Sequence, residues 1–182
     1  MKKCLSALAL ICLTVPAVGS ARDASLKLPD FSPLAAKATE SVNLSLNPWL
    51  LKIAAAMLDD KDADDAATKK VLSGIKSIEI RSYQFATDFA YSAADIDAVR
   101  QQLSAPGWSQ VMQVHDRKKS QNVDMYILLD NNRTNGFALI ASEPREFTII
   151  NIVGSIAIED LPRLEQHLHL RDLAAGQAHL LM

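Results

Sequence analysis

Up to Gly74 the apolar residues recur mostly at helical spacing. After Gly74 they alternate with polar residues as in strands. The pattern predicts a helix over residues 48–58, because Asn47 is a good N-cap and Pro48 suits the first helical position. Three more elements are predicted in this half: a helix from Ser32 to Glu40, an edge strand over residues 42–46, and a helix over residues 64–73 with Gly74 just after its end.

After Gly74 the chain is rich in β-branched and aromatic residues, which is typical of strands. Short turn sequences such as 143–145 separate the last four segments, so we expect these to form an antiparallel meander. One helix is predicted before this meander, where Ser92 and Asp95 resemble a capping box, and another after Asp160. The five predicted strands cover residues 75–85, 108–115, 123–130, 136–142 and 147–153.

Both faces of this sheet carry many apolar residues, so each face needs a cover. We expect an α+β fold: an antiparallel sheet of about five strands, dominated by the C-terminal four-strand meander, with helices packed on its faces. One face would carry Tyr83, Tyr126 and Ile140, together with Leu128, Ile150 and Ile152. Either the N-terminal helices cover that face, or it contacts a second copy or a protein partner. In the second case Tyr83, Tyr126 and Ile140 would be the anchors.

Residues 1–21 have the features of a secretory signal: two lysines, an apolar run and small residues at its end. The run is shorter than the roughly 20 residues that span a bilayer, so we expect cleavage rather than stable membrane insertion. Residues 22–182 would then form a single domain in the periplasm or outside the cell. A lipid anchor on Cys12 is the alternative, but Leu10 and Ile11 precede it where lipoprotein processing needs a small residue.

The composition argues against nucleic acid as a partner and against disulfides as a source of stability. The chain has 182 residues, 49% hydrophobic and 22% charged, with a net charge of −2. Its basic residues form no long run, so we expect no nucleic-acid binding. Because Cys4 and Cys12 both lie in the predicted signal, the mature domain would be stabilised by burial alone, without disulfides.

Asp60, Asp62 and Asp64 have the spacing that opens a calcium-binding loop. Such a loop also needs glycine at its sixth position and glutamate at its twelfth. Here those positions hold Asp65 and Val71, so we interpret the aspartates as an acidic start to a helix.

Other catalytic or metal-binding patterns are incomplete. His167 and His169 would point apart on a helix, and no cysteine of the mature chain could complete a zinc site. No serine lies in a nucleophile-elbow motif, and no glycine-rich loop could hold phosphate. The basic tract 115–119 falls where two strands must be joined and is interpreted as a hairpin turn. We therefore expect no catalytic residue, no cofactor and no metal.

Several segments together resemble an exported bacterial family called domain of unknown function 4252. They are residues 107–108, 122–126, 136–140 and 143–156, in this order of elements. The resemblance covers residues 28 to about 170, and the tract 151–156 is its most specific part. It implies no activity, cofactor or catalytic residue. Many members resemble lipoproteins, whereas this sequence lacks a convincing lipobox.

Three function classes follow from these observations. The leading hypothesis is a non-catalytic protein of the bacterial cell envelope that acts by protein–protein interaction. A carrier of a small apolar ligand or lipid is the first alternative, and an enzyme of unrecognised type is the second.

Overall fold

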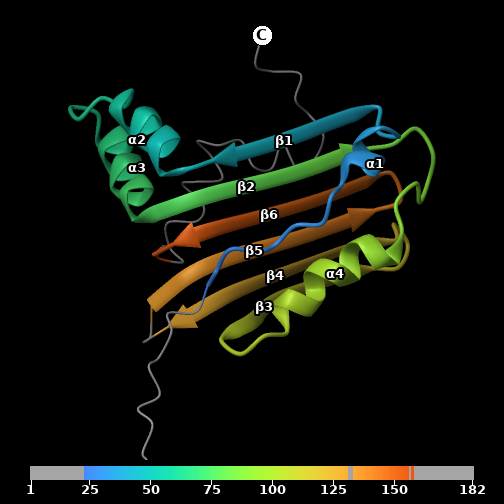
Figure 1. Cartoon of the computed structure of the whole chain (residues 1–182). Coiled ribbons are helices and arrows are strands. Elements are labelled where there is room, and N and C mark those ends of the chain that lie inside the picture. Colours follow the sequence, from blue (N-terminus) through green and yellow to red (C-terminus); the bar gives the residue numbers. More distant parts are fainter. Residues whose placement is uncertain (1–22, 131–132, 156, 158–182) are drawn as a thin grey trace, which may run out of the picture.

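The computed structural model describes residues 23–130, 133–155 and 157, which form a six-stranded antiparallel sheet with helices at its faces (Figure 1). The strand order is β1-β2-β6-β5-β4-β3, and the predicted α+β class is confirmed. In chain order the elements are α1 (Ser32–Ala35), β1 (Glu40–Leu46), α2 (Pro48–Ala56), α3 (Ala63–Gly74), β2 (Ile75–Gln84), α4 (Ala93–Leu103), β3 (Trp108–Asp116), β4 (Gln121–Asp130), β5 (Arg133–Glu143) and β6 (Glu146–Gly154).

The sheet has six strands rather than about five, because β1 pairs with β2 along its whole length. Leu44 lies opposite Ile80 and Leu46 opposite Ile78, so the apolar side chains of this edge strand continue the sheet's apolar face. The predicted four-strand meander is confirmed as β3 to β6. The helix that begins at Ser32 is a single turn, because the chain then enters the sheet, where the Thr39 amide donates to Gln84.

The first face of the sheet is covered by α4, α1 and the N-terminal segment of residues 23–31, which crosses the central strands alongside α4 (Figure 1). Asn151 of β6 holds this segment: its side chain accepts from the Leu26 amide at 3.0 Å and donates to the Ala24 carbonyl at 3.1 Å. Gln102 of α4 holds it from the other side. The buried residues of this layer are Leu26, Phe31, Leu34, Tyr83, Phe85, Ile96, Val99, Leu103, Ala138, Ile140, Phe147 and Ile149.

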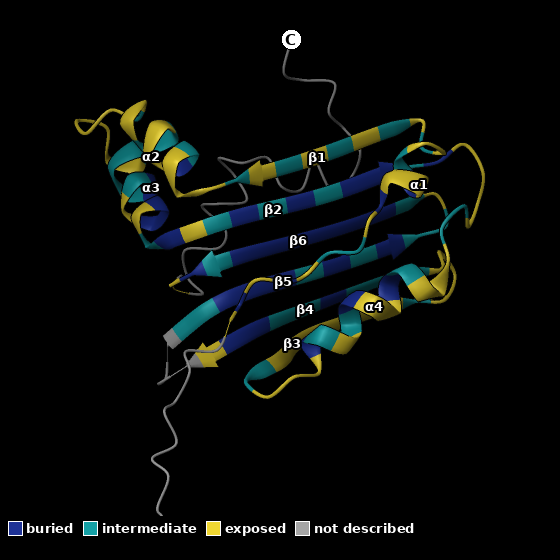
Figure 2. Ribbon diagram, in the orientation of Figure 1, coloured by how far each residue is buried: buried dark blue, intermediate teal, exposed yellow. Residues whose placement is uncertain are grey.

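The second face carries α2 and α3, which pack at the end of the sheet where β1 ends and β2 begins (Figure 1). The central strand β6 is buried along most of its length (Figure 2). Ile150 and Ile152 belong to this face, so placing them beside Tyr83 and Ile140 was wrong; side chains alternate along a strand, and in β6 it is Ile149 that shares the face of Ile140. The buried residues of this second layer are Leu51, Val71, Leu72, Ile75, Ile78, Ile80, Ile127, Phe137, Ile150 and Ile152.

Two predicted helix starts are confirmed in atomic detail. The Asn47 side chain accepts from the amides of Trp49 and Leu50 at 3.0 Å, and so caps α2. The Asp95 carboxylate reaches back to the Ser92 amide at 2.8 Å at the start of α4.

Gly74 was predicted to follow the end of its helix, and this was wrong. It is the last residue of α3, and Ile75 begins β2 directly. A close backbone approach accounts for the glycine instead, since a Cβ there would overlap the carbonyl oxygen of Ser155.

Candidate functional site

The acidic residues around the α2–α3 connection form local hydrogen bonds and an ion pair. Asp62 is the N-cap of α3 and accepts from the amides of Asp64 and Asp65. Asp60 pairs with Lys69 at 2.7 Å. The carboxylates of the calcium-like spacing therefore do not converge on one point, and the described residues contain no cluster of three or more metal-ligating side chains.

The structure places three residues that were predicted to share one face of the sheet on its first face: Tyr83, Tyr126 and Ile140. Tyr83 is 2% exposed and Ile140 1% exposed, whereas Tyr126 is partly buried against the same layer. Tyr83 packs against the ring of Phe31, whose segment covers it. In this conformation Tyr83 and Ile140 are core residues, and a role for the three in binding a partner stays a prediction.

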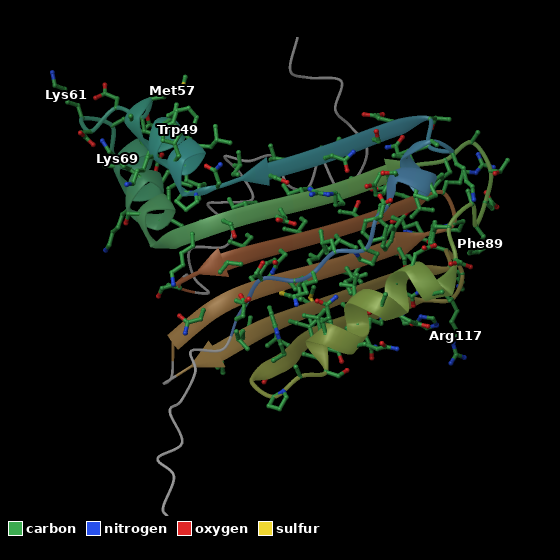
Figure 3. The ribbon with its side chains drawn as sticks, viewed as in Figure 1. Trp49, Met57, Lys61, Lys69, Phe89 and Arg117 are labelled. Atoms are coloured by element: carbon green, nitrogen blue, oxygen red, sulfur yellow. The ribbon has the colours of Figure 1, made fainter. Side chains whose placement is uncertain are left out.

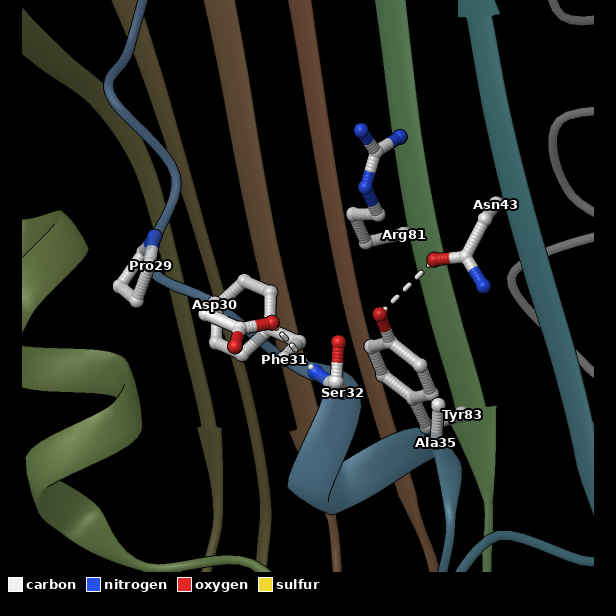
Figure 4. Close-up of a pocket in the computed structure, with 8 residues that line it drawn as sticks. All are labelled: Pro29, Asp30, Phe31, Ser32, Ala35, Asn43, Arg81 and Tyr83. Atoms are coloured by element: carbon white, nitrogen blue, oxygen red, sulfur yellow. Dashed lines mark hydrogen bonds between the residues drawn. The ribbon is translucent and has the colours of Figure 1, made fainter.

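A polar cleft of about 340 Å³ lies above β1 and β2 where α1 begins (Figure 4). Polar groups that line the cleft form hydrogen bonds with one another. The Tyr83 hydroxyl donates to Asn43 Oδ1 at 2.8 Å, and the Asp30 side chain accepts from the Ser32 amide at 2.9 Å. The Arg81 guanidinium donates to the carbonyls of Leu44 and Ile80, both at 2.9 Å. Burial raises the pKa of Tyr83, which keeps its hydroxyl a donor. These contacts stabilise the edge of the sheet.

A buried carboxylate on β4 was not singled out by the sequence. The Asp124 side chain is 3% exposed and accepts from Arg100 Nη2 of α4 at 2.6 Å. Its other oxygen accepts from Gln110 at 3.0 Å and Gln113 at 3.3 Å. Because every lone-pair direction has a donor, this cluster fastens α4 to the sheet rather than offering a reactive group.

Two glutamates face each other at the end of the β5–β6 hairpin. Glu143 and Glu146 are directly paired in the sheet register. Burial, and secondly the charge of Glu143, raise the pKa of Glu146 to about 7. Neither carboxylate lines either of the two clefts described in this section.

Helix α2 exposes apolar side chains along one side. Trp49 is 66% exposed, Ile53 41% and Met57, at the end of the helix, 83%. Their spacing of four residues places them in one stripe, here called the α2 stripe (Trp49, Ile53 and Met57), on the helical hairpin that projects from the end of the sheet (Figure 3). The sequence pattern does not reveal this surface, because its apolar spacing is that of a buried helix face. The signal that could have revealed it is that α2 has only one charged residue, Lys52, and too many apolar positions for one buried side.

Beside the stripe lies a groove between α2, α3 and the start of β2, with a volume of about 530 Å³. Its floor is formed by Leu51, Ala55, Leu72 and Ile75. Three lysines stand among its lining residues: Lys52, Lys69 and Lys76. We call this the lysine groove. On the helix surface, Ala56 lies between the groove and the α2 stripe, so the two form a continuous surface.

A family model described as Domain of unknown function (DUF4252) matches residues 35–164, which is more than half of the chain. The chain belongs to this family. The DUF4252 match includes both helices of the projecting hairpin and all six strands, and its N-terminal boundary lies at the last residue of α1. The N-terminal segment that crosses the first face lies outside it. No curated protein matches the chain.

Two further predictions concern residues of this DUF4252 protein. The tract 115–119 does lie where β3 and β4 are joined: its first two residues end β3 and the rest enter the turn, in which Asp116 accepts from the amides of Lys118 and Lys119. His167 and His169, and the helix predicted after Asp160, lie outside the described residues. Within the described part of the chain, none of the helices has the length and apolar character needed to cross a membrane.

Proposed function

We propose that this protein is exported to the bacterial cell envelope and acts there, without catalysis, by binding another protein through the α2 stripe. The observation that supports this proposal is the exposure of Trp49 and Met57 on one side of a helix whose other side is already packed. Leaving large apolar side chains in water opposes solubility, so such a surface marks an interaction site when its members are contiguous. Tryptophan is also enriched among the residues that dominate interface energies.

A protein partner explains the stripe better than a lipid surface does. Asp59 and Asp60 follow Met57 after a single intervening residue, Leu58, and Asp60 is strongly exposed. An anionic bilayer would repel these carboxylates just where Met57 would have to insert. A protein surface could accommodate the stripe and leave the acidic turn in water.

A second exposed apolar surface, on the edge strand β3, serves as a comparison for the α2 stripe. The edge strand β3 exposes Val111 and Val114, 49% and 44% respectively. A bulge between Gln110 and Met112 interrupts its pairing, and lysines occupy the following turn, both of which discourage edge-to-edge association. We therefore assign the partner to α2 rather than to this edge.

Site-specific photocrosslinking in the envelope tests the proposal. A crosslinking residue at position 49 or 57 should capture the same partner, while one at position 111 should not. With that partner purified, the double variant Trp49→Ala, Met57→Ala should bind it at least about tenfold more weakly. An unchanged melting temperature would show that the variant is folded. Equal capture from position 111, or unchanged affinity of the folded double variant, would contradict the proposal.

Export is a separate part of the proposal and has its own measurement. Mass spectrometry of the mature N-terminus should find a chain that begins near residue 22. An intact Met1 would show that the signal is not removed, and a diacylglyceryl group on Cys12 would show a lipoprotein.

The first alternative, a carrier of a small apolar ligand or lipid, is favoured by the lysine groove. The second, an enzyme of unrecognised type, is favoured by the raised pKa of Glu146 beside Glu143. It is weakened because neither carboxylate lines a cleft described here.

A further inference from the structure

The geometry points to the lysine groove as a binding site for an anionic amphiphile with one alkyl chain, of the fatty-acid class. Its volume of about 530 Å³ lies within the range of about 300–1,000 Å³ that small-molecule sites occupy. Such sites combine an apolar lining with a few polar groups that fix the ligand's orientation. This groove has both features: its floor is apolar, and its polar groups are the lysines of the rim.

The floor of the groove is suited to an alkyl chain. Leu51 and Leu72 face each other from α2 and α3, and Ile75 closes the end where β2 begins. Ala55, between them on α2, has too small a side chain to fill the space. Each methylene group that leaves water for this floor would tighten binding by up to about fourfold, so affinity should rise with chain length.

The charge of the rim selects the head group. Lys52 and Lys76 are exposed, and neither makes an ion pair with a described residue. Lys69 is already paired with Asp60. No aspartate or glutamate is among the described residues that line the groove, so the rim carries uncompensated positive charge. A carboxylate at the end of an alkyl chain would contact Lys52 and Lys76 while the chain lies on the floor.

This inference develops the carrier alternative and does not depend on the protein partner proposed for the α2 stripe. Trp49 and Met57 do not line the groove, so the two sites can be tested by separate variants. A leucine- and glutamate-rich segment of another protein has related chemistry and is the competing occupant.

Isothermal titration calorimetry of the mature protein with dodecanoate below its micelle concentration tests the inference. We expect saturable binding of one molecule, weaker binding of butyrate by at least about a hundredfold, and no binding of dodecylamine. The double variant Lys52→Gln, Lys76→Gln should raise the Kd for dodecanoate about fivefold to tenfold. The matched control Lys37→Gln, Lys61→Gln removes two exposed lysines outside the groove and should leave the Kd unchanged.

Each contrary outcome would overturn the inference. Absence of saturable binding, equal binding of dodecylamine, or equal loss in both lysine variants would show that the groove does not select an anionic alkyl chain. Binding of a leucine–glutamate peptide in place of dodecanoate would identify the groove as a protein-docking site. The variant Trp49→Ala, Met57→Ala should retain dodecanoate binding, so a failure of the partner proposal can be distinguished from a failure of this one.

Discussion

Glu143 and Glu146 lie directly opposite each other across the β5–β6 hairpin, so two carboxylates of like charge share one end of the sheet. The Gln121 side chain donates to the Glu143 carboxylate. Glu146 is partly buried, and its side chain accepts a long hydrogen bond of 3.5 Å from the Thr148 hydroxyl. Burial, and secondly the charge of Glu143, raise the pKa of Glu146 to about 7.

The stability of the protein should fall as pH rises from about 4.5 to about 7. The folded state raises the pKa of Glu146 from 4.5 to about 7, so it binds a proton that the unfolded chain releases in this window. The contribution is fully present below pH 4.5 and lost by about pH 7. A change of this size corresponds to at most about 3 kcal/mol, and solvent screening of a partly exposed group lowers that to about 1–2 kcal/mol.

Urea denaturation between pH 4.5 and 7.5 measures this dependence. Glu146→Gln removes the titrating group and should flatten the curve, with its largest gain in stability near neutral pH. Asp60→Asn is a matched control, because Asp60 is an exposed carboxylate far from the hairpin end. A wild-type curve that rises over the window, or an equally steep curve for Glu146→Gln, would contradict the assignment.

Gly154 should tolerate no side chain. Its φ is +143°, and a Cβ would lie 2.7 Å from the Cα of Ile75, where α3 passes directly into β2. Both backbone strain and overlap with main-chain atoms oppose alanine there, so Gly154→Ala should destabilise the fold by about 2 kcal/mol or more. Gly107 also has positive φ, 101°, but lies in a turn, and Gly107→Ala should cost only about 1 kcal/mol. Melting temperatures of the two variants compare the effects directly, and similar losses would refute the close-approach explanation.

The sequence predicted element types well because their signals are local. Asn47 and Pro48 mark a helix start, and the turn at 143–145 marks a hairpin, whatever lies elsewhere in the chain. The face of a strand is a less local property. Ile150 and Ile152 were assigned to the wrong side because both sides of β6 are apolar, so alternation carries no information there.

The candidate site could not be predicted, because the exposed side of a helix depends on which other helices and strands of the fold pack against it. Ile53 and Met57 look like a buried helix face, yet α2 packs through Leu51 instead. The lysine groove is likewise assembled from α2, α3 and β2, whose relative placement no periodicity reveals. The crossing of the first face by residues 23–31 depends on long-range bonds to Asn151 and was also invisible in the sequence.

Removing Arg100 should destabilise the fold strongly. The Asp124 carboxylate is 3% exposed, and Arg100 supplies two of its donors. Arg100→Met would leave a buried charge with only glutamine donors, at a cost of about 3 kcal/mol. Arg100→Met combined with Asp124→Asn removes that charge and should recover a large part of the loss. Chemical denaturation of the single and double variants forms a thermodynamic cycle, and a double variant less stable than the single one would argue against a buried ion pair.

Two isoleucine truncations separate the core face from the proposed contact surface. Ile140 is 1% exposed beneath the N-terminal segment and α4, whereas Ile53 is 41% exposed on the α2 stripe. Ile140→Ala would leave a cavity in a packed layer and should destabilise the fold by about 2–4 kcal/mol. Ile53→Ala removes atoms that are largely solvated and should change stability by less than about 1 kcal/mol. Urea denaturation gives both values on one scale. If Ile140→Ala were nearly neutral, the first face would not be a closed core, and Tyr83, Tyr126 and Ile140 would again be candidates for contact with a partner.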